Sequence, residues 1–340
     1  MKFSKKSIVF YVIFFIAFYF FITYELPYYI QRPGNTEPLK PIVEVSGGYP
    51  SEGEMHLVTV SGLHATPFQY ILAKVLPHND VRPLNEVIPE GITPDDYMHA
   101  QLQVMESSQE ASLVVAFEAA GKDIVIDYVG VYVVNVVEDM PSYGKLEVGD
   151  RIVEIDGQEI KEASDLVDYV QTKRAGDTIK VVGFRNNEPF EQEITLDYFP
   201  DDPEKVGIGI SLVTDREITV HPNVKFSSGK IGGPSAGLMF ALEIYDQLTE
   251  EDITKGYNIA GTGEIDYEGN VSRIGGVDKK VVSAEKEGMD IFFVPYEGGK
   301  ANSNYEEAKR KAEEINANMK IVPVDTFYDA LNYLKELPEK

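Results

Sequence analysis

The sequence is best approached from the segment Gly229-Lys230-Ile231-Gly232-Gly233-Pro234-Ser235-Ala236-Gly237-Leu238-Met239-Phe240-Ala241-Leu242. A glycine-rich loop here enters an apolar run, which predicts a helix that begins close to Ser235. The first N–H groups of a helix have no partner within it, so they can stabilise negative charge near the serine hydroxyl. Such charge develops on the carbonyl oxygen during acyl transfer. On this segment alone, however, an ordinary cap at Ser235 is the favoured interpretation.

The spacing Gly233-x-Ser235-x-Gly237 also matches the nucleophile elbow of the α/β-hydrolases. That family requires an acid and then a histidine after the serine. All five histidines precede Ser235, so the elbow fails on chain order: they are His56, His64, His78, His99 and His221. A His–Asp–Ser order stays open, although no histidine lies in a recognisable motif for it.

A second segment, from Gly261 to Ala284, offers a different base. It is interpreted as a strand, a turn, a strand, a glycine pair and a helix that starts near Val277. Lys280 lies in the first turn of that helix and borders its apolar face, so it can point back toward the glycine-rich loop. We expect its neighbour Lys279 to face solvent.

Together these segments resemble the Lon peptidase family. Gly233-Pro234-Ser235-Ala236-Gly237 matches the serine loop, Thr262-Gly263-Glu264 matches the Thr-Gly-Glu strand, and Ile274-Gly275-Gly276-Val277-x-x-Lys280 matches the lysine motif. The resemblance implies a Ser235 nucleophile and a Lys280 general base, with Thr262 orienting the lysine and Gly233, Pro234 and Ala236 supporting the loop. Gly232 is a departure, because many members carry an acidic residue there.

Residues 124–200 contain several predicted strands, and their sequence resembles a second family. Leu146, Gly149-Asp150, Ile152 and Ile155-Asp156-Gly157 fit the pattern of a PDZ domain. By that resemblance a peptide C-terminus would add as a strand beside a carboxylate-binding loop at Tyr128-Val129-Gly130-Val131, with Tyr132 next to it. This loop departs from the common Gly-Leu-Gly-Phe form. The alternative is a domain that only sets geometry or gates access.

The N-terminus predicts a membrane anchor over residues 1–30. Lys2, Lys5 and Lys6 precede an uncharged run of 18 residues, Ser7 to Tyr24, which spans about 27 Å as a helix. The flanking lysines favour a cytoplasmic N-terminus, so the rest of the chain is expected outside the cell. A cleaved signal peptide is the alternative, but no small-x-small cleavage pattern follows. The proline-containing stretch in residues 31–54 predicts a linker.

The whole pattern resembles the membrane-anchored PDZ–Lon proteases of Gram-positive bacteria. We expect an α+β fold with a transmembrane helix and a Lon-type domain, residues 55–123 and 201–340, split by a PDZ-like domain at 124–200. No phosphate-binding loop is present, so an ATP-independent serine endopeptidase is expected, acting on extracellular peptides or flexible segments. The alternative is a catalytically silent PDZ scaffold.

The amino-acid composition limits the kinds of partner and cofactor that the protein can bind. The 340 residues carry 31 basic and 56 acidic side chains, a net charge of −25, and no cysteine. Such a surface repels nucleic acid, and thiolate metal sites and cysteine nucleophiles are excluded. We expect neither metal nor cofactor, peptide or protein substrates, the membrane as a partner through the N-terminal helix, and self-association by resemblance only.

Overall fold

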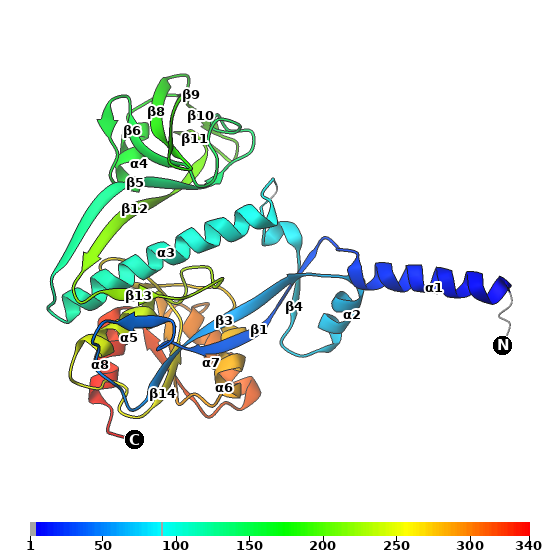
Figure 1. The fold of residues 1–340 in the computed structure, drawn as a ribbon, viewed down its shortest axis with the longest axis vertical. Helices are drawn as coiled ribbons and strands as arrows, with labels where there is room; N and C mark the ends of the chain where they lie inside the picture. Colours follow the sequence, from blue (N-terminus) through cyan, green and yellow to red (C-terminus); the bar gives the residue numbers. More distant parts are fainter. Residues whose placement is uncertain (1–4, 90) are drawn as a thin grey trace.

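A six-stranded sheet organises the lower part of the molecule in Figure 1. The computed structural model describes residues 5–89 and 91–340. The strand order is β18-β17-β14-β3-β1-β4. The bounds of these strands are Lys320–Val324 for β18, Ile291–Pro295 for β17, Asn258–Gly261 for β14, Glu54–His64 for β3, Tyr28–Pro38 for β1 and Asp80–Pro83 for β4.

This sheet is mixed, and its parallel half decides the fold class. β3, β14, β17 and β18 are parallel, whereas β1 is antiparallel to both β3 and β4. Helices α6 (Val277–Lys286) and α7 (Asn304–Ile315) connect β14 to β17 and β17 to β18. Parallel neighbours require crossovers of this kind. The fold is therefore mixed α/β, and the predicted α+β class is wrong in this respect.

Helix α5 (Gly237–Leu248) is the centre of the main core. All of its residues are buried. It packs against α3 (Pro94–Ala119) and α8 (Phe327–Glu336), and its apolar side chains join those of β3, β14 and β17 in one cluster. A helix that is surrounded on all sides cannot shift without opening the core. The serine loop in front of it is therefore held on a rigid support.

A second body with its own core is inserted between residues 124 and 220. Its sheet has the order β12-β5-β6-β8-β9, and thirteen buried side chains from Val131 to Ile208 form its core. The core therefore continues past residue 200, the predicted end of this domain. The elements are β5 (Ile124–Val136), β6 (Arg151–Ile155), β7 (Gln158–Glu159), α4 (Ala163–Gln171), β8 (Thr178–Arg185), β9 (Glu188–Thr195), β10 (Asp197–Phe199), β11 (Asp202–Gly207) and β12 (Ile210–Val220).

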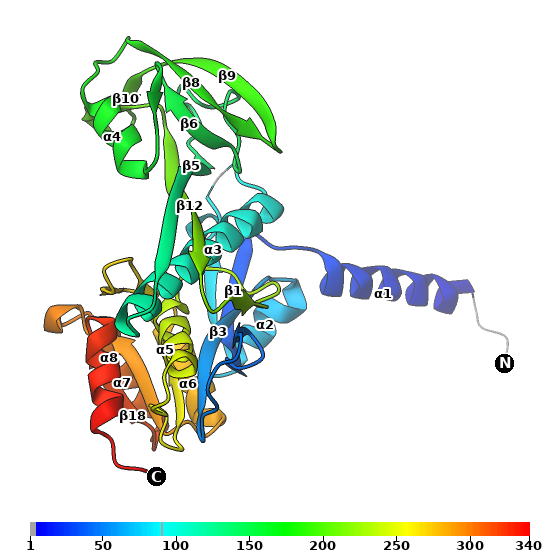
Figure 2. The same ribbon diagram turned by 60° about the vertical axis from the view of Figure 1, so that its left-hand side comes forward.

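Two long strands join the inserted domain to the main body. β5 leaves the end of α3 and β12 returns beside it, paired from Ile124↔Val220 to Val136↔Ile210. Figures 1 and 2 show this ladder rising from the main body to the inserted domain, with α3 running between the two bodies. Smaller elements complete the main body: β2 (Val43–Val45), α2 (Pro67–Val75), β13 (Val224–Phe226), β15 (Glu264–Ile265) and β16 (Val271–Ser272).

The predicted linker over residues 31–54 is wrong. Most of Gln31–Pro41 belongs to β1, which lies between β3 and β4 in the sheet. Proline is tolerated in a strand at a bulge or where its missing N–H has no ladder partner. Pro33 meets both conditions, because pairing with β4 ends at Gln31 and the register with β3 shifts just after Pro33.

The predicted transmembrane helix is also wrong. The N-terminal run does form a helix, α1 (Lys5–Thr23), of 19 residues. Across residues 5–89 and 91–340, no helix combines the length and the apolar character required to cross a membrane. Residues 1–4 of the predicted anchor, with Lys2, lie outside the described residues.

Candidate active site

Ser235 lies on the loop that enters α5, and the residues after β14 hold it there. The Ser235 carbonyl accepts hydrogen bonds from the Gly263 N–H at 2.9 Å and from the Thr262 hydroxyl at 3.0 Å. The peptide group is thus fixed on one side, while the side chain stays partly exposed. The serine is therefore accessible on a backbone that cannot rotate freely.

Lys280 approaches this serine from the first turn of α6. Its amine donates to the Ser235 hydroxyl oxygen at 2.7 Å and to the Thr262 hydroxyl oxygen at 2.8 Å. The residue is only 3% exposed, and burial lowers its pKa to about 7. Desolvation disfavours the ammonium form when no carboxylate offsets it. Among the described residues, no acid forms an ion pair with Lys280. The amine is therefore available as a base near neutral pH.

Thr262 connects the two partners. It is fully buried directly after β14, accepts a hydrogen bond from Lys280 and donates one to the Ser235 carbonyl. One hydroxyl has one proton to donate, so these two bonds fix its orientation. The Thr262 lone pair then faces the lysine amine. The structure thus brings together the three residues that the sequence motifs singled out.

Helix α3 holds the opposite side of the serine loop through three hydrogen bonds. Its Ser108 hydroxyl donates to the Pro234 carbonyl at 3.0 Å, and its Ser112 hydroxyl donates to the Gly237 carbonyl at 2.8 Å. The Gln101 carbonyl accepts the Gly233 N–H at 2.8 Å. Sequence reasoning missed these contacts, because no local pattern ties a helix about 130 residues upstream to this loop.

Gly232 explains how α3 can come so close. A Cβ atom at this position would lie 2.9 Å from the Cβ of Gln101, closer than real side chains approach. Gly233 has a φ of +87°, a conformation that favours glycine. Gly232, which stands where many Lon proteases carry an acidic residue, therefore lies where helix α3 packs tightly against the serine loop.

Two backbone donors at the serine remain available for a ligand. Within the described part of the chain, neither the Ser235 N–H nor the Ala236 N–H has an acceptor, whereas the Gly233 N–H is used by Gln101. Ala236 is buried and caps α5. Donors at a helix start, next to a nucleophile, suit a developing oxyanion.

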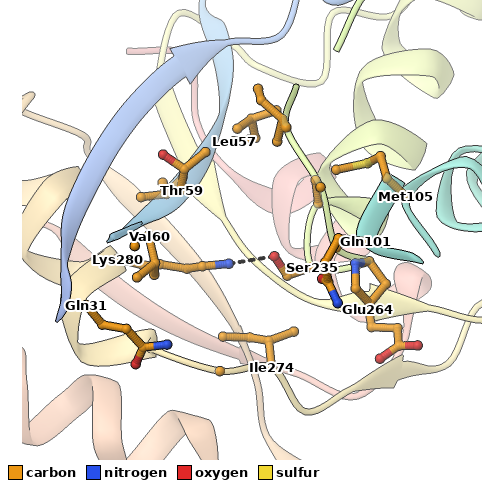
Figure 3. A pocket seen from close by; sticks show the side chains of 18 of the residues that line it. Gln31, Leu57, Thr59, Val60, Gln101, Met105, Ser235, Glu264, Ile274 and Lys280 are labelled. Carbon is orange, nitrogen blue, oxygen red and sulfur yellow. Dashed lines mark hydrogen bonds between the residues drawn. The ribbon is translucent and has the colours of Figure 1, made fainter. Parts of the chain in front are cut away.

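A cavity of about 630 Å³ opens over the serine. Figure 3 shows Lys280 pointing at Ser235 across its floor, with Met105 and Gln101 of α3 on one side and Leu57 of β3 on another. Glu264 also lines the cavity, and burial raises the pKa of its carboxyl. The described residues that line this cavity include no histidine, in keeping with a lysine base.

The exposed position predicted for Lys279 is wrong. This side chain is 2% exposed, and its amine contacts Asp278 at 2.8 Å and the Asp80 carboxylate. The first turn of α6 packs toward the β1–β4 edge of the sheet, so the methylene stem is covered while the charged end reaches two acids. Adjacent lysines are thus both buried, but only Lys279 is paired with carboxylates.

Of the predicted peptide-binding residues Val129, Gly130, Val131 and Tyr132, the last two offer no free strand edge. They lie within β5, where Val131 pairs with Thr214 of β12 on one side and with Ile152 of β6 on the other. A peptide can add only to an unpaired edge. Val131 and Tyr132 therefore have no edge for an added strand, whereas Gly130 pairs only with Asp215 of β12 and Val129 lies at a register shift of that ladder.

A groove of about 440 Å³ lies elsewhere in the inserted domain, between α4 and the start of β12. Leu166 and Val170 of α4, Ile210 and Leu212 of β12, and Phe199 of β10 line it. The segment that joins β11 to β12 also lines it and reads Val206-Gly207-Ile208-Gly209-Ile210. Its alternation of glycine and apolar residues resembles the Gly-Leu-Gly-Phe form of the carboxylate-binding loop, which was predicted at residues 128–131.

Comparisons with known proteins match two parts of the chain to two family models. Residues 100–196 match the family model of the PDZ domain. Residues 191–336 match that of the Lon protease (S16) C-terminal proteolytic domain. The second match contains the serine loop, Thr262 and Lys280.

Curated relatives agree with the second match. The chain is 28% identical over 138 residues to a Lon protease of Aster yellows witches'-broom phytoplasma, covering 40% of this chain and 16% of that protein. It is 31% identical over 132 residues to one of Campylobacter jejuni (38% and 16%) and 33% identical over 141 residues to one of Malacoplasma penetrans (42% and 17%). The chain thus spans about a sixth of the length of these relatives.

Among solved structures, the PDZ domain of an SdrC-like protein from Listeria monocytogenes is 36% identical over 26% of this chain and 90% of that one, with a TM-score of 0.24. The buried lysine and the partly exposed serine that it contacts both lie in the region that matches the Lon proteolytic domain, and the region that matches the PDZ domain precedes it. The chain thus combines a region similar to PDZ domains with a region similar to the proteolytic domain of Lon proteases.

Proposed function

We propose that this protein is an endopeptidase that cleaves peptide bonds with Ser235 and Lys280, without ATP. The observation that carries the proposal is the 2.7 Å contact between the Lys280 amine and the Ser235 hydroxyl, made by a fully buried lysine whose pKa is about 7. A neutral amine at hydrogen-bond distance from a hydroxyl is the arrangement that activates a serine in the absence of histidine.

The reaction begins when neutral Lys280 takes the hydroxyl proton of Ser235. The serine oxygen then bonds to the carbonyl carbon of the substrate, and the oxyanion is held by the N–H groups of Ser235 and Ala236. The protonated lysine gives its proton to the leaving nitrogen as the C–N bond breaks. Water next attacks the acyl-enzyme and loses a proton to Lys280, and the serine leaves as its hydroxyl is restored.

Thr262 acts in this scheme as a positioning residue. Its two hydrogen bonds tie the lysine amine and the serine carbonyl to one buried hydroxyl. Because the lysine side chain has four rotatable bonds, an acceptor at its tip limits the conformations in which it misses the serine. The same acceptor also stabilises the ammonium that forms after proton transfer.

The substrates in this proposal are flexible segments of peptides and proteins. The cavity over Ser235 has room for several side chains and is lined by apolar residues such as Leu57 and Met105 as well as by Glu264. A folded protein does not fit such a space, and the sequence carries no phosphate-binding loop for an unfolding motor. Cleavage should therefore be limited to segments that are already unfolded.

The groove between α4 and β12 is proposed to bind the C-terminal end of a peptide. Within the described residues, the N–H groups of Ile208 and Gly209 have no acceptor, and they lie beside the groove. Unpaired successive N–H groups suit a carboxylate. The apolar walls at Leu166 and Val170 suit an apolar last side chain.

Substitution of the pair tests the proposal. Ser235→Ala and Lys280→Ala should each abolish cleavage of an unfolded protein, and the double variant should lose no more than either single one, because the residues work as a unit. A serine-reactive probe should label the wild type and not Ser235→Ala. Retained proteolysis by a folded Lys280→Ala protein would contradict the mechanism, and absence of labelling would favour a silent scaffold.

A further inference from the structure

One carboxyl group in the cavity over Ser235 has no partner in the protein. Glu264 lines this cavity and is half-buried. Within residues 5–89 and 91–340, its side chain makes no hydrogen bond and no ion pair. Burial raises the pKa of this carboxyl, and no neighbouring cation of the protein offsets that effect. Because a partly desolvated acid without a counter-charge is unfavourable, the group is suited to a cation that the protein itself does not supply.

The backbone around Glu264 is fixed next to the nucleophile. The Gly263 N–H donates to the Ser235 carbonyl at 2.9 Å, and the Gly263 carbonyl accepts the Leu238 N–H at 3.1 Å. Glu264 itself pairs with Ser272 in the hairpin of β15 and β16. The carboxyl group therefore stays one residue from a direct contact with the serine. An extended substrate advances about 3.3 Å per residue, so this group can reach only side chains within about two residues of the cut bond.

A second polar side chain of the same cavity is also free. The Gln101 side chain lies over the serine loop at Gly233, where an ideal Cβ atom would lie 3.1 Å from its amide oxygen. In the part of the chain that the structure describes, this amide makes no hydrogen bond. Figure 3 shows Gln101 and Glu264 on the opposite side of Ser235 from Lys280. The amide oxygen and the carboxylate both accept hydrogen bonds, and an ammonium or a guanidinium can donate to both.

The cations that line the cavity do not neutralise this acid. Arg273 donates to Glu297 at 3.0 Å and to the Asn302 carbonyl at 2.6 Å. The Lys280 amine is held by its two hydroxyl partners. Lys230 is exposed, so water screens its charge. The net charge of −25 adds a long-range attraction for basic peptides. Both the cavity and the whole surface therefore favour a substrate that carries positive charge.

We propose that Glu264 and Gln101 form a subsite for a lysine or arginine side chain within two residues of the cut bond. The proposal rests on the proposed function and adds a substrate class to it. The carboxylate supplies the counter-charge, and the amide oxygen supplies a second acceptor. Charge-assisted hydrogen bonds in a partly desolvated site are among the strong ones, so kcat/KM should be at least about tenfold higher when the substrate carries the cation.

The test begins with the positions at which the enzyme cuts. An unfolded protein is digested, and mass spectrometry identifies the ends of the products. Lysine and arginine should be enriched at one position within two residues of the cut bonds. A quenched fluorescent peptide with lysine at that position is then compared with the same peptide that carries acetyl-lysine, which keeps the stem and removes the charge. The lysine peptide should have a kcat/KM at least about tenfold higher.

Two variants that remove one negative charge each provide the matched control. Glu264→Gln should reduce the ratio of the kcat/KM values for lysine and acetyl-lysine to about one. Glu268 is exposed in the turn of the same hairpin and does not line the cavity, so Glu268→Gln should keep the ratio. Glu264→Asp keeps the charge and should keep part of the preference, and Gln101→Leu should lower the ratio without abolishing it. Labelling of Ser235 by a serine-reactive probe shows that each variant has a formed active site.

The outcomes separate this subsite from the proposed function. Equal kcat/KM values for the two peptides in the wild type, or no enrichment of basic residues, overturn the subsite and leave the endopeptidase proposal standing. A preference that survives Glu264→Gln, or that falls equally in Glu268→Gln, also overturns it.

A salt titration decides the question if Glu264→Gln is not labelled by the probe. In about 1 M salt, where the Debye length is about 3 Å, a preference caused by the general surface charge should disappear and overturn the subsite, whereas a half-buried pair should keep most of it. Absence of Ser235-dependent cleavage of every peptide and of the unfolded protein overturns the proposed function, and the subsite with it.

Discussion

The pH dependence of cleavage is the sharpest consequence of the buried lysine. Burial lowers the pKa of Lys280 from 10.5 to about 7. Only the neutral amine can take the serine proton, so kcat/KM should follow the deprotonated fraction of the free enzyme. That fraction is about nine-tenths at pH 8, about one-tenth at pH 6 and about one-hundredth at pH 5. An ordinary lysine would instead give a rate that rises about tenfold per pH unit up to about pH 10.

The assay is the initial rate of hydrolysis of a quenched fluorescent peptide at low substrate concentration, measured between pH 5 and pH 10. Circular dichroism at each pH shows whether the protein remains folded, so that a loss of structure is not counted as titration. The peptide carries no group that titrates between pH 5 and pH 9, which leaves the enzyme as the source of the profile. We expect a rise with slope one below pH 7 and a plateau above pH 8.

A profile that still rises with slope one between pH 8 and pH 10 would refute the reasoning, because it would mean that the amine stays protonated in the pocket. A flat profile from pH 5 to pH 9 would be equally damaging, since it would exclude the lysine as the base. A midpoint of the kcat/KM profile within about one pH unit of 7 agrees with desolvation as the cause of the lowered pKa of Lys280.

Three further predictions follow from the same contacts. Lys280→Met should raise the free energy of unfolding by several kcal/mol below pH 7, where folding buries the lysine ammonium, and by little above pH 10.5, where the lysine is neutral in both the folded and the unfolded state; urea titration at both pH values measures this. Thr262→Val should lower kcat by about 10- to 100-fold through misplacement of the amine, with KM nearly unchanged. Gly232→Ala should lower thermal stability and activity, since its Cβ meets Gln101, and adding Gln101→Gly should restore part of the activity.

The chemistry of the site was predictable because short local patterns carry it. The serine loop, the Thr-Gly-Glu strand and the lysine motif each lie within a few residues, and helical spacing already directed Lys280 toward the apolar face. The structure places the Lys280 amine 2.7 Å from the Ser235 hydroxyl oxygen and 2.8 Å from the Thr262 hydroxyl oxygen. Their roles in cleavage stay a prediction until the substitutions are made.

The missed features depend on contacts between distant segments. Composition alone suggested a linker where β1 pairs with β3, because the bulge that accommodates Pro33 is a property of the paired strands. The burial of Lys279 depends on Asp80, about 200 residues away in sequence. The peptide-binding residues were predicted on the first strand of the domain, whereas the groove lies at the start of the last strand, after Gly207-Ile208-Gly209. The sequence indicated that one domain is inserted into another. It did not indicate that the core of the inserted domain extends as far as Ile208.

The ladder of β5 and β12 has a consequence for how this protein could change. Ile124 and Val220 face each other at its base, so the chain departs from the main body and returns to it at points about one strand spacing, roughly 5 Å, apart. Removal of everything between them would leave two ends that a tight turn could reconnect. The inserted domain is therefore interchangeable in principle: a different domain with neighbouring termini could be grafted at the same two residues, and the serine and lysine would keep their supports.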